Sequence, residues 1–283
     1  MHIDRWGVLL ALAAFANAPA LANEVVLSVN GFAGPEAVRY DPDQDVYFVA
    51  NFNGDTKGDA NGFVSKVSPG GEILALQFMT GTQAVPFHAG RGMWLRGDQL
   101  WVADAEGVHA FDRRSGAHER FVSLAAFEPG FPNDIAEGSD GALYVTDTGR
   151  QVIYRIAEGE ATIAVSTPFA ANGITRARQA DRFLLAPWRG AEALMAWRVG
   201  TDTFVPAVTF AGGGNFDGVE RVGSKIYVAS QQDASLHVLS DGEDRGRIAL
   251  AGKPADMGVD TKRKRLIVPY VALNRIDIIA LEP

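Results

Sequence analysis

A short apolar strand pattern recurs six times along this chain, and its even spacing constrains the possible folds more than any other feature. The copies end at residues 50, 103, 146, 186, 229 and 269, so neighbouring copies lie 53, 43, 40, 43 and 40 residues apart. β-branched and aromatic residues dominate the copies, as half-buried strands require. The copies are residues 47–50, 100–103, 143–146, 183–186, 226–229 and 266–269. A repeat of this length, built from short strands, is typical of β-propeller blades.

Six such units account for the chain from residue 23 to residue 283. The sequence therefore predicts an all-β fold: a single six-bladed β-propeller with four-stranded antiparallel blades. The last unit, residues 257–281, has room for only three strands, so we expect the strand at 25–29 to complete it and close the ring. The longest interval predicts a surface loop around residues 51–62. A β-sandwich and a β-helix are the alternatives, although the unit is too long for one β-helix coil.

The first 22 residues have the pattern of a secretory signal peptide. Arg5 precedes a short apolar run at 6–15, and Ala20-Leu21-Ala22 is a small-x-small cleavage site. A membrane anchor is the alternative, but the run is well short of the roughly 20 residues that a membrane span needs. We expect cleavage after Ala22 and a periplasmic or secreted protein with no membrane span in the mature chain.

The composition excludes several kinds of site and partner. None of the 283 residues is cysteine, which excludes a disulfide framework, a thiolate zinc site and a cysteine nucleophile. The formal net charge of −8 argues against a protein that binds nucleic acid. No Gly-x-Ser-x-Gly sequence occurs, which argues against a serine-hydrolase elbow.

A polar residue stands 12–14 positions before the end of each repeat copy, where the innermost strand of a blade is expected to begin. Innermost strands line the channel of a propeller, so these side chains are predicted to converge at its mouth. Carboxylate and amide oxygens suit a hard cation such as Ca²⁺, Mg²⁺ or Mn²⁺ better than Zn²⁺. The alternative is that they serve turns or hold channel water. The six residues are Glu36, Arg91, Asn133, Asn172, Asp217 and Asp256.

The sequences around these positions resemble the senescence marker protein, gluconolactonase and luciferin-regenerating-enzyme-like family. The resemblance covers essentially the whole chain after residue 22 and rests on Gly34-Pro35-Glu36, Pro132-Asn133-Asp134, Asn172-Gly173 and Asp217-Gly218, in that order. It implies a six-bladed propeller that holds one divalent cation through Glu36, Asn172 and Asp217. It also implies that Asn133 contacts substrate or metal-bound water.

The chain departs from the family pattern at one position. Family lactonases often carry arginine two residues before the third-blade asparagine, whereas this chain has Phe131 there. Strictosidine-synthase-like and NHL-repeat propellers have related blades and are alternatives.

The predicted function is hydrolysis of a lactone or related ester, with a small molecule as substrate. One divalent cation (Ca²⁺, Mg²⁺, Mn²⁺ or Zn²⁺) is expected to polarise the carbonyl or to activate water. We expect Asp217 to be both ligand and general base, and Asn133 to bind the developing oxyanion or the substrate. Arg91 and Asp134 are expected to contact substrate. The alternative is a non-enzymatic propeller that binds a small ligand or a partner protein, because the fold does not decide function.

Overall fold

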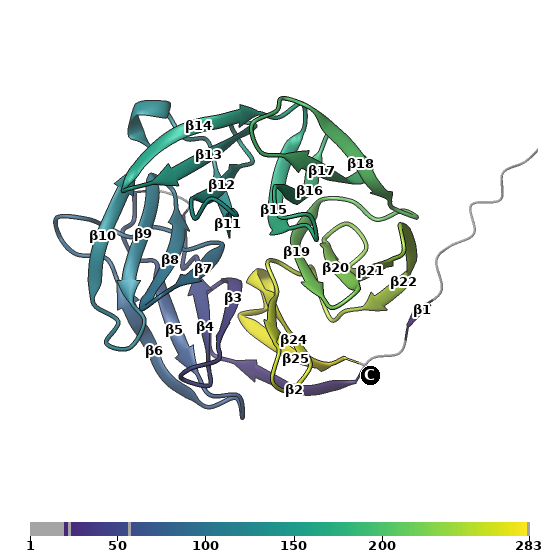
Figure 1. Ribbon diagram of the computed structural model, residues 1–283. Helices are drawn as coiled ribbons and strands as arrows, with labels where there is room; N and C mark the ends of the chain where they lie inside the picture. The colour runs from purple at the N-terminus through teal and green to yellow at the C-terminus, as the bar shows by residue number, and fades with distance from the viewer. Residues whose placement is uncertain (1–19, 22–23, 56–57, 282–283) are drawn as a thin grey trace, which may run out of the picture.

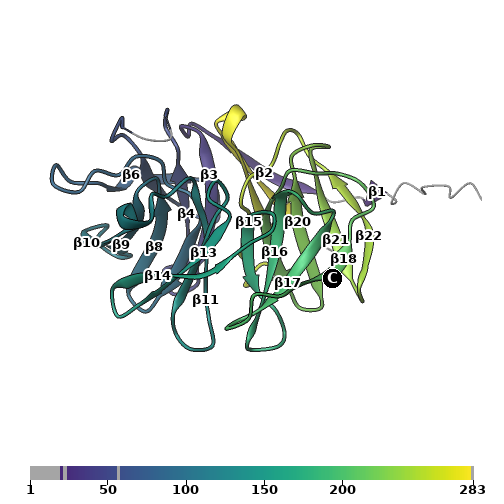
Figure 2. The same ribbon diagram turned by 90° about the horizontal axis from the view of Figure 1, so that it is seen from above.

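The computed structural model describes residues 20–21, 24–55 and 58–281. Within these residues, six four-stranded antiparallel units follow one another in chain order around a central axis (Figure 1). The ring is wider than it is tall when it is viewed from the side (Figure 2). The predicted six-bladed β-propeller is therefore confirmed.

Each blade is a meander whose strands run outward from the channel. The first three blades contain β3 (Pro35–Asp41), β4 (Val46–Asn51), β5 (Phe63–Val67) and β6 (Ile73–Thr80); β7 (Met93–Arg96), β8 (Gln99–Asp104), β9 (Gly107–Asp112) and β10 (His118–Ser123); and β11 (Pro132–Glu137), β12 (Leu143–Asp147), β13 (Val152–Ala157) and β14 (Glu160–Ser166). The next two contain β15 (Ala170–Arg176), β16 (Arg182–Arg189), β17 (Ala193–Arg198) and β18 (Phe204–Thr209); and β19 (Phe216–Val222), β20 (Lys225–Ser230), β21 (Ser235–Ser240) and β22 (Glu243–Ala249). The described helix consists of two 3-10 turns, η1 (Ala125–Phe127) and η2 (Val271–Leu273).

The sixth blade joins the two ends of the chain. It contains β23 (Gly258–Asp260), β24 (Arg265–Tyr270) and β25 (Arg275–Ala280), and its outermost strand is β2 (Val25–Asn30), which pairs antiparallel with β25 (Figure 1). The ring also closes at the channel, because the amide of Asp256 donates to the carbonyl of Glu36 at 2.8 Å. The expected closure by an N-terminal strand is confirmed.

Six apolar clusters hold the blades together, one between each pair of neighbours. Between the first two blades, for example, Phe48 and Val64 pack in one cluster with Met93 and Val102. Because each cluster is made by side chains from two blades, the apolar alternation of the repeat strands is satisfied only in the closed ring.

The predicted signal peptide lies mostly outside the described residues, as does the cleavage point at Ala22. Ala20 and Leu21 form β1 (Ala20–Leu21), which pairs parallel with β22 at Arg247 and Ile248. None of the helices in the described ranges is long and apolar enough to cross a membrane.

The predicted loop at 51–62 connects β4 to β5. His88 binds its far end, since Nδ1 accepts hydrogen bonds from the amides of Gly58 and Ala60, both at 3.1 Å. The loop is thereby attached to the segment that leads into the second blade.

A candidate cation site at the mouth of the channel

Four of the predicted residues lie on irregularities of the innermost strands. The pairing register shifts between Pro35 and Ala37 in β3, between Pro132 and Ile135 in β11, between Ala171 and Ile174 in β15, and between Phe216 and Val219 in β19. These intervals contain Glu36, Asn133, Asn172 and Asp217. A β-bulge re-aims a side chain, and bulges concentrate next to functional sites. The bulges therefore explain how the first residues of four strands can face the channel together.

Two glycines allow neighbouring innermost strands to approach closely at this level. A Cβ atom on Gly173 would overlap the carbonyl oxygen of Asp217, and one on Gly218 would overlap Oδ1 of Asp256. Both glycines lie inside strands, β15 and β19, rather than in turns. The Asn-Gly and Asp-Gly pairs therefore bring the blades together, which differs from the turn role considered as an alternative.

The loops that lead into the innermost strands are held by the last residue of the second strand of the same blade. In four blades the side chain of this residue accepts a hydrogen bond from a backbone amide of the loop. The pairs are Asn51 with Ala33 (3.0 Å), Asp104 with Ala89 (2.7 Å), Asp147 with Phe131 (2.7 Å) and Ser230 with Gly214 (3.1 Å). These bonds give the site a rigid support although its residues follow loops.

The side chains of Glu36, Asn133, Asn172 and Asp217 line one cavity of about 650 Å³ at the mouth of the channel. Each of these residues is buried, between 2% and 6% exposed. The structure thus brings together the three residues predicted to bind the cation and the asparagine predicted to act beside them.

Each of the four residues presents one buried oxygen that has no hydrogen-bond partner. These atoms are Oε2 of Glu36, Oδ1 of Asn133, Oδ1 of Asn172 and Oδ1 of Asp217. A buried acceptor without a partner costs free energy, on the order of 1–3 kcal/mol. Four acceptors on one cavity form a site that a cation or its bound water would satisfy.

The orientation of the Asn133 amide follows from its neighbours. Oγ1 of Thr148 donates its proton to the carbonyl of Ala171 at 2.9 Å, so this oxygen can only accept from Asn133 Nδ2, which lies 3.3 Å away. Oδ1 of Asn133 is therefore the amide atom that is left without a partner. An acceptor in this place suits a water or a hydroxyl group, or the cation itself, better than it suits an oxyanion.

The Asp217 carboxylate is held through its second oxygen. Nε2 of Gln231 donates to Oδ2 of Asp217 at 2.7 Å, which leaves Oδ1 free. Gln231 therefore fixes which oxygen of Asp217 is left without a partner.

The channel beneath the mouth contains more buried acids than buried bases. Burial raises the pKa of Glu36 well above its ordinary value, and the charge of Asp217 adds to this effect. Burial also raises the pKa of Asp217 and of Asp134 to about 7 and raises that of Asp256. The positive charge of the nearby Arg91 lowers the pKa of Glu36 and so offsets part of this rise. An excess of buried acid is the electrostatic environment that a cation stabilises.

The ligand atoms at the channel mouth decide which kind of metal ion fits there. In the described ranges, no cluster of three or more His, Cys, Asp or Glu residues is placed to hold a metal ion. The channel mouth instead offers two carboxylates and two amide oxygens, which are oxygen ligands of the kind that Ca²⁺ or Mg²⁺ takes. The residues fit a hard cation and do not suit a site built on histidine or thiolate.

The other predicted residues lie behind the cavity wall. The carboxylate of Asp134 accepts the amide of Ile174 at 2.8 Å and so joins the third blade to the fourth. Arg91 is 1% exposed, and its Nη1 donates to the carbonyl of Pro132 at 2.8 Å. Within the described residues, neither side chain lines the cavity. Direct contact of Arg91 or Asp134 with substrate stays a prediction. Asp256 is likewise buried behind the wall, next to Gly218.

Five wall residues share a position that the sequence analysis did not use. Each stands two residues after the end of a repeat copy, where the second strand of its blade meets the cavity. They are Phe52, Thr148, Trp188, Gln231 and Val271. These five residues form a second ring along the cavity wall. The spacing of the repeat alone would have been enough to identify them.

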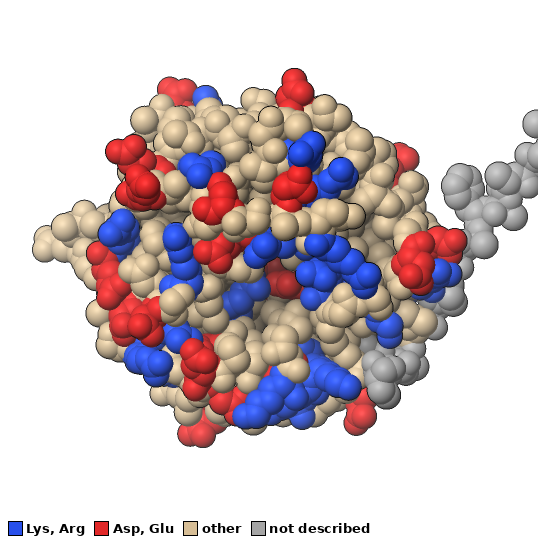
Figure 3. Space-filling view, in the orientation of Figure 1, with Lys and Arg blue, Asp and Glu red and all other residues tan. Residues whose placement is uncertain are grey.

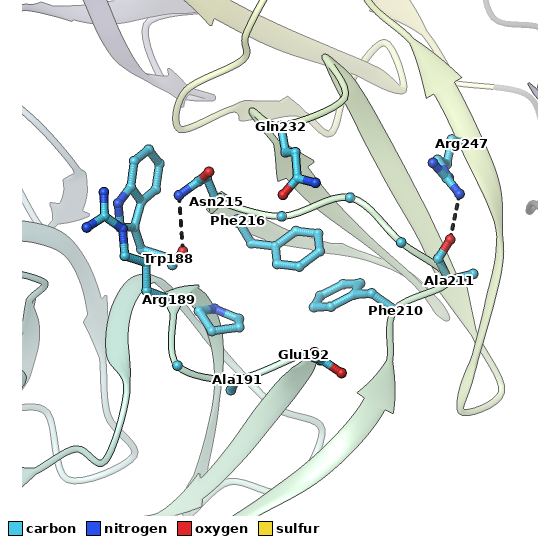
Figure 4. A pocket seen from close by; sticks show the side chains of 15 residues that line it. Trp188, Arg189, Ala191, Glu192, Phe210, Ala211, Asn215, Phe216, Gln232 and Arg247 are labelled. Carbon is cyan, nitrogen blue, oxygen red and sulfur yellow. Dashed lines mark hydrogen bonds between the residues drawn. The ribbon is translucent and has the colours of Figure 1, made fainter.

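A second and larger cavity of about 1200 Å³ lies beside the first, between the fourth and fifth blades (Figure 4). The two cavities share Trp188 and Arg189. Phe210 and Phe216 stack in its floor with ring centres 3.7 Å apart. The four unpartnered oxygens belong to the smaller cavity, so we place the candidate site there despite its size.

Charge on the face of the ring shown in Figure 3 is mixed. Both basic and acidic side chains lie around the central opening on this face. The buried acids of the channel are therefore not continued there as a large surface patch of one sign.

Comparison with known proteins supports the fold at low sequence identity. No family profile matches the sequence, and no curated protein sequence matches it. A gluconolactonase from Xanthomonas campestris is similar in structure, with a TM-score of 0.70 and 15% identity over 94% of this chain and 97% of that one. The calcium-binding protein regucalcin from Agrobacterium tumefaciens has a TM-score of 0.66 and 18% identity over 89% of this chain and 87% of that one.

The resemblance predicted from the sequence is thus confirmed at the level of the fold. A virginiamycin B lyase from Staphylococcus aureus is similar as well, with a TM-score of 0.63 and 14% identity over 90% of this chain and 99% of that one. Proteins with different activities share this ring, so the chemistry has to be argued from the site.

Proposed function

We propose that this protein hydrolyses a lactone or a related ester at a divalent cation bound in the mouth of the channel. The observation that carries the proposal is the set of four unpartnered buried oxygens on one cavity. Glu36, Asn172 and Asp217 would hold the cation. The structural similarity to a gluconolactonase and to a calcium-binding regucalcin supports the same assignment.

A bound divalent cation supplies Lewis-acid chemistry, which polarises a carbonyl and lowers the pKa of water. Asp217 acts as the general base: its carboxylate takes a proton from the attacking water, and the hydrogen bond from Gln231 to Oδ2 holds this carboxylate in place. The water oxygen forms a bond to the carbonyl carbon, and the bond from this carbon to the ring oxygen breaks. Asp217 returns the proton to the leaving oxygen, so one water is consumed and a hydroxy acid results. Oδ1 of Asn133 orients the water or a substrate hydroxyl.

We further propose that the protein is exported and that residues 1–22 are removed. The n-region, the short apolar run and the Ala20-Leu21-Ala22 motif support this assignment. The intact mass of protein recovered from the periplasm or the medium of an expressing cell tests it. A chain that begins at Asn23 is expected, and a retained N-terminus would contradict export by cleavage.

Hydrolysis of lactones by the purified protein, before and after chelation and with Ca²⁺, Mg²⁺ or Mn²⁺ restored, tests the proposed reaction. We expect chelation to abolish turnover and one of the ions to restore it. Asp217→Asn should lower kcat by about 100-fold or more, because it removes a general base. Asp202→Asn is the matched control, since Asp202 is exposed in the turn between β17 and β18. A bound cation without hydrolysis of any lactone or ester would instead support a binding propeller.

A further inference from the structure

The wall above the four oxygens is apolar on several sides. Phe52, Phe131, Trp188 and Val271, which we call the apolar wall, come from the first, third, fourth and sixth blades. The rings of Phe52 and Phe131 stack with centres 6.3 Å apart and planes 26° from parallel. The cavity therefore combines a polar floor with an apolar wall.

The apolar wall continues outward to the surface. The turn η2 contains Val271, which lines the cavity, and Leu273, and their side chains are 38% and 43% exposed. Exposed apolar side chains at the edge of a cavity are a feature of ligand-binding grooves. A ligand in the cavity therefore meets an exposed apolar side chain, Val271, at its edge.

The polar side chains of the wall are mostly engaged already. The hydroxyl of Thr148 is used by Asn133 and Ala171, and the amide nitrogen of Gln231 is used by Asp217. Gln151 and Arg189 also line the cavity, and within the described residues neither makes a side-chain hydrogen bond or ion pair. Few side chains of the wall are therefore free to bind the hydroxyl groups of a sugar lactone, which carries one on most of its carbons.

The polar side chain that lies behind Phe131, Arg91, does not reach the cavity. The guanidinium of Arg91 lies against the rings of Phe131 and Phe52 and donates to the carbonyl of Pro132. It supports the aromatic pair from behind. The charge nearest to this part of the wall is therefore separated from the ligand by the rings.

We propose that the substrate is a lactone or ester with an apolar substituent next to the reacting group, and not a polyhydroxylated sugar lactone. This inference rests on the proposed function for the reaction itself. The carbonyl faces the four oxygens, while the substituent packs on the apolar wall. Burial of each further methylene on such a wall should tighten binding by about fourfold.

Three lactones with the same six-membered ring test the inference. They are δ-valerolactone, which has no substituent, δ-decalactone, which carries a pentyl chain, and glucono-δ-lactone, which carries hydroxyl groups. We expect kcat/KM for δ-decalactone to exceed that for glucono-δ-lactone by at least about tenfold, after subtraction of spontaneous hydrolysis. An equal or higher kcat/KM for glucono-δ-lactone would overturn the inference.

Variants of the wall show whether these residues cause the preference. Phe131→Ala should lower kcat/KM for δ-decalactone about tenfold and change that for δ-valerolactone little, because only the larger substrate contacts the ring. Phe131→Leu should restore most of the loss. Phe78→Ala is the matched control, since Phe78 is a half-buried aromatic residue on the outer strand β6. Equal losses for both lactones in Phe131→Ala would contradict the assigned role.

A binding measurement separates this inference from the proposed reaction. Calorimetry with the product acids, 5-hydroxydecanoate and gluconate, does not require turnover. At least about tenfold tighter binding of 5-hydroxydecanoate supports the apolar site, and tighter or equal binding of gluconate overturns it. Loss of hydrolysis for all three lactones, with the binding preference intact, would overturn the proposed reaction and leave the ligand class standing.

Discussion

The guanidinium carbon of Arg91 lies 3.8 Å from the centre of the Phe131 ring and 5.1 Å from that of Phe52. Phe131 itself carries no charge, and the guanidinium behind this pair of rings comes from the second blade. Burial lowers the pKa of Arg91, although Glu36 and two aspartates raise it. The charge on the buried Arg91 side chain therefore lowers the free energy of unfolding.

We predict that Arg91→Met stays within about 1 kcal/mol of the wild type in free energy of unfolding, because an apolar replacement removes a poorly compensated buried charge. The same variant should bind a divalent cation roughly tenfold more tightly, since a positive charge near Glu36 is removed. Urea unfolding and calorimetry with Ca²⁺ measure the two effects. Arg96→Met is the control, because Arg96 is exposed and pairs with Glu137. Unchanged cation affinity in Arg91→Met would contradict the electrostatic argument.

Gln231→Leu should weaken cation binding by roughly 10- to 100-fold, because the loss of a residue that orients a ligand has this effect in metal sites. The bond from Gln231 to Oδ2 of Asp217 is the basis for the expectation. Gln232→Leu is the matched control, since its side chain lines the neighbouring cavity instead. If both variants bind Ca²⁺ with the same affinity as the wild type, Gln231 does not orient the ligand.

Gly173→Ala is expected to destabilise the fold by about 1–3 kcal/mol, because overpacking forces backbone shifts. The added Cβ would lie 2.9 Å from the amide nitrogen of Val219, and this backbone cannot rotate away as a side chain could. The nearest atom to a Cβ on Gly70 is Oγ of Ser68 at 3.7 Å, so Gly70→Ala should stay within about 0.5 kcal/mol. Chemical unfolding of both variants is the measurement. Equal stability would mean that the blades can separate at no cost.

Lowering the pH should reduce the free energy of unfolding of the wild type more than it reduces that of Asp104→Asn. Burial pushes the pKa of Asp104 up, but the hydrogen bonds from His109 and from the amide of Ala89 hold it below its ordinary value. A carboxyl with a lowered pKa in the folded state stabilises the fold above the pH at which the unfolded chain titrates, about 4. This contribution disappears as the pH falls through the lower folded value.

The difference in unfolding free energy between the wild type and Asp104→Asn should therefore be constant near neutral pH and shrink below about pH 4. Urea unfolding at a series of pH values measures it. The curve of Asp202→Asn should run parallel to that of the wild type, because Asp202 is exposed. A difference that does not change between pH 7 and pH 2 would show that Asp104 titrates normally in the fold.

The number of blades and the identity of the four channel residues could be predicted because both are repeated local patterns. Strands 40 to 53 residues apart with the same apolar alternation indicate equivalent units, and a polar residue at the same place in each unit is expected near the same axis. The second ring at Phe52 and Gln231 follows from the same spacing. It was missed because these residue types differ from blade to blade and form no visible motif.

The sequence by itself determined the ring: six apolar repeats, a spare strand to close them, and polar residues at the inner end of most blades. Only the tertiary structure decided which atoms of those residues are free. Arg91 was expected to reach the substrate, but its packing against Phe52 and Phe131 involves residues about 40 positions away on both sides. Likewise, Oδ1 of Asn133 is left without a partner because the Thr148 hydroxyl donates to Ala171 and accepts from Nδ2 of Asn133. Periodicity is a local property that a sequence displays directly, whereas contacts between blades and the sharing of protons depend on where the closed ring places distant side chains.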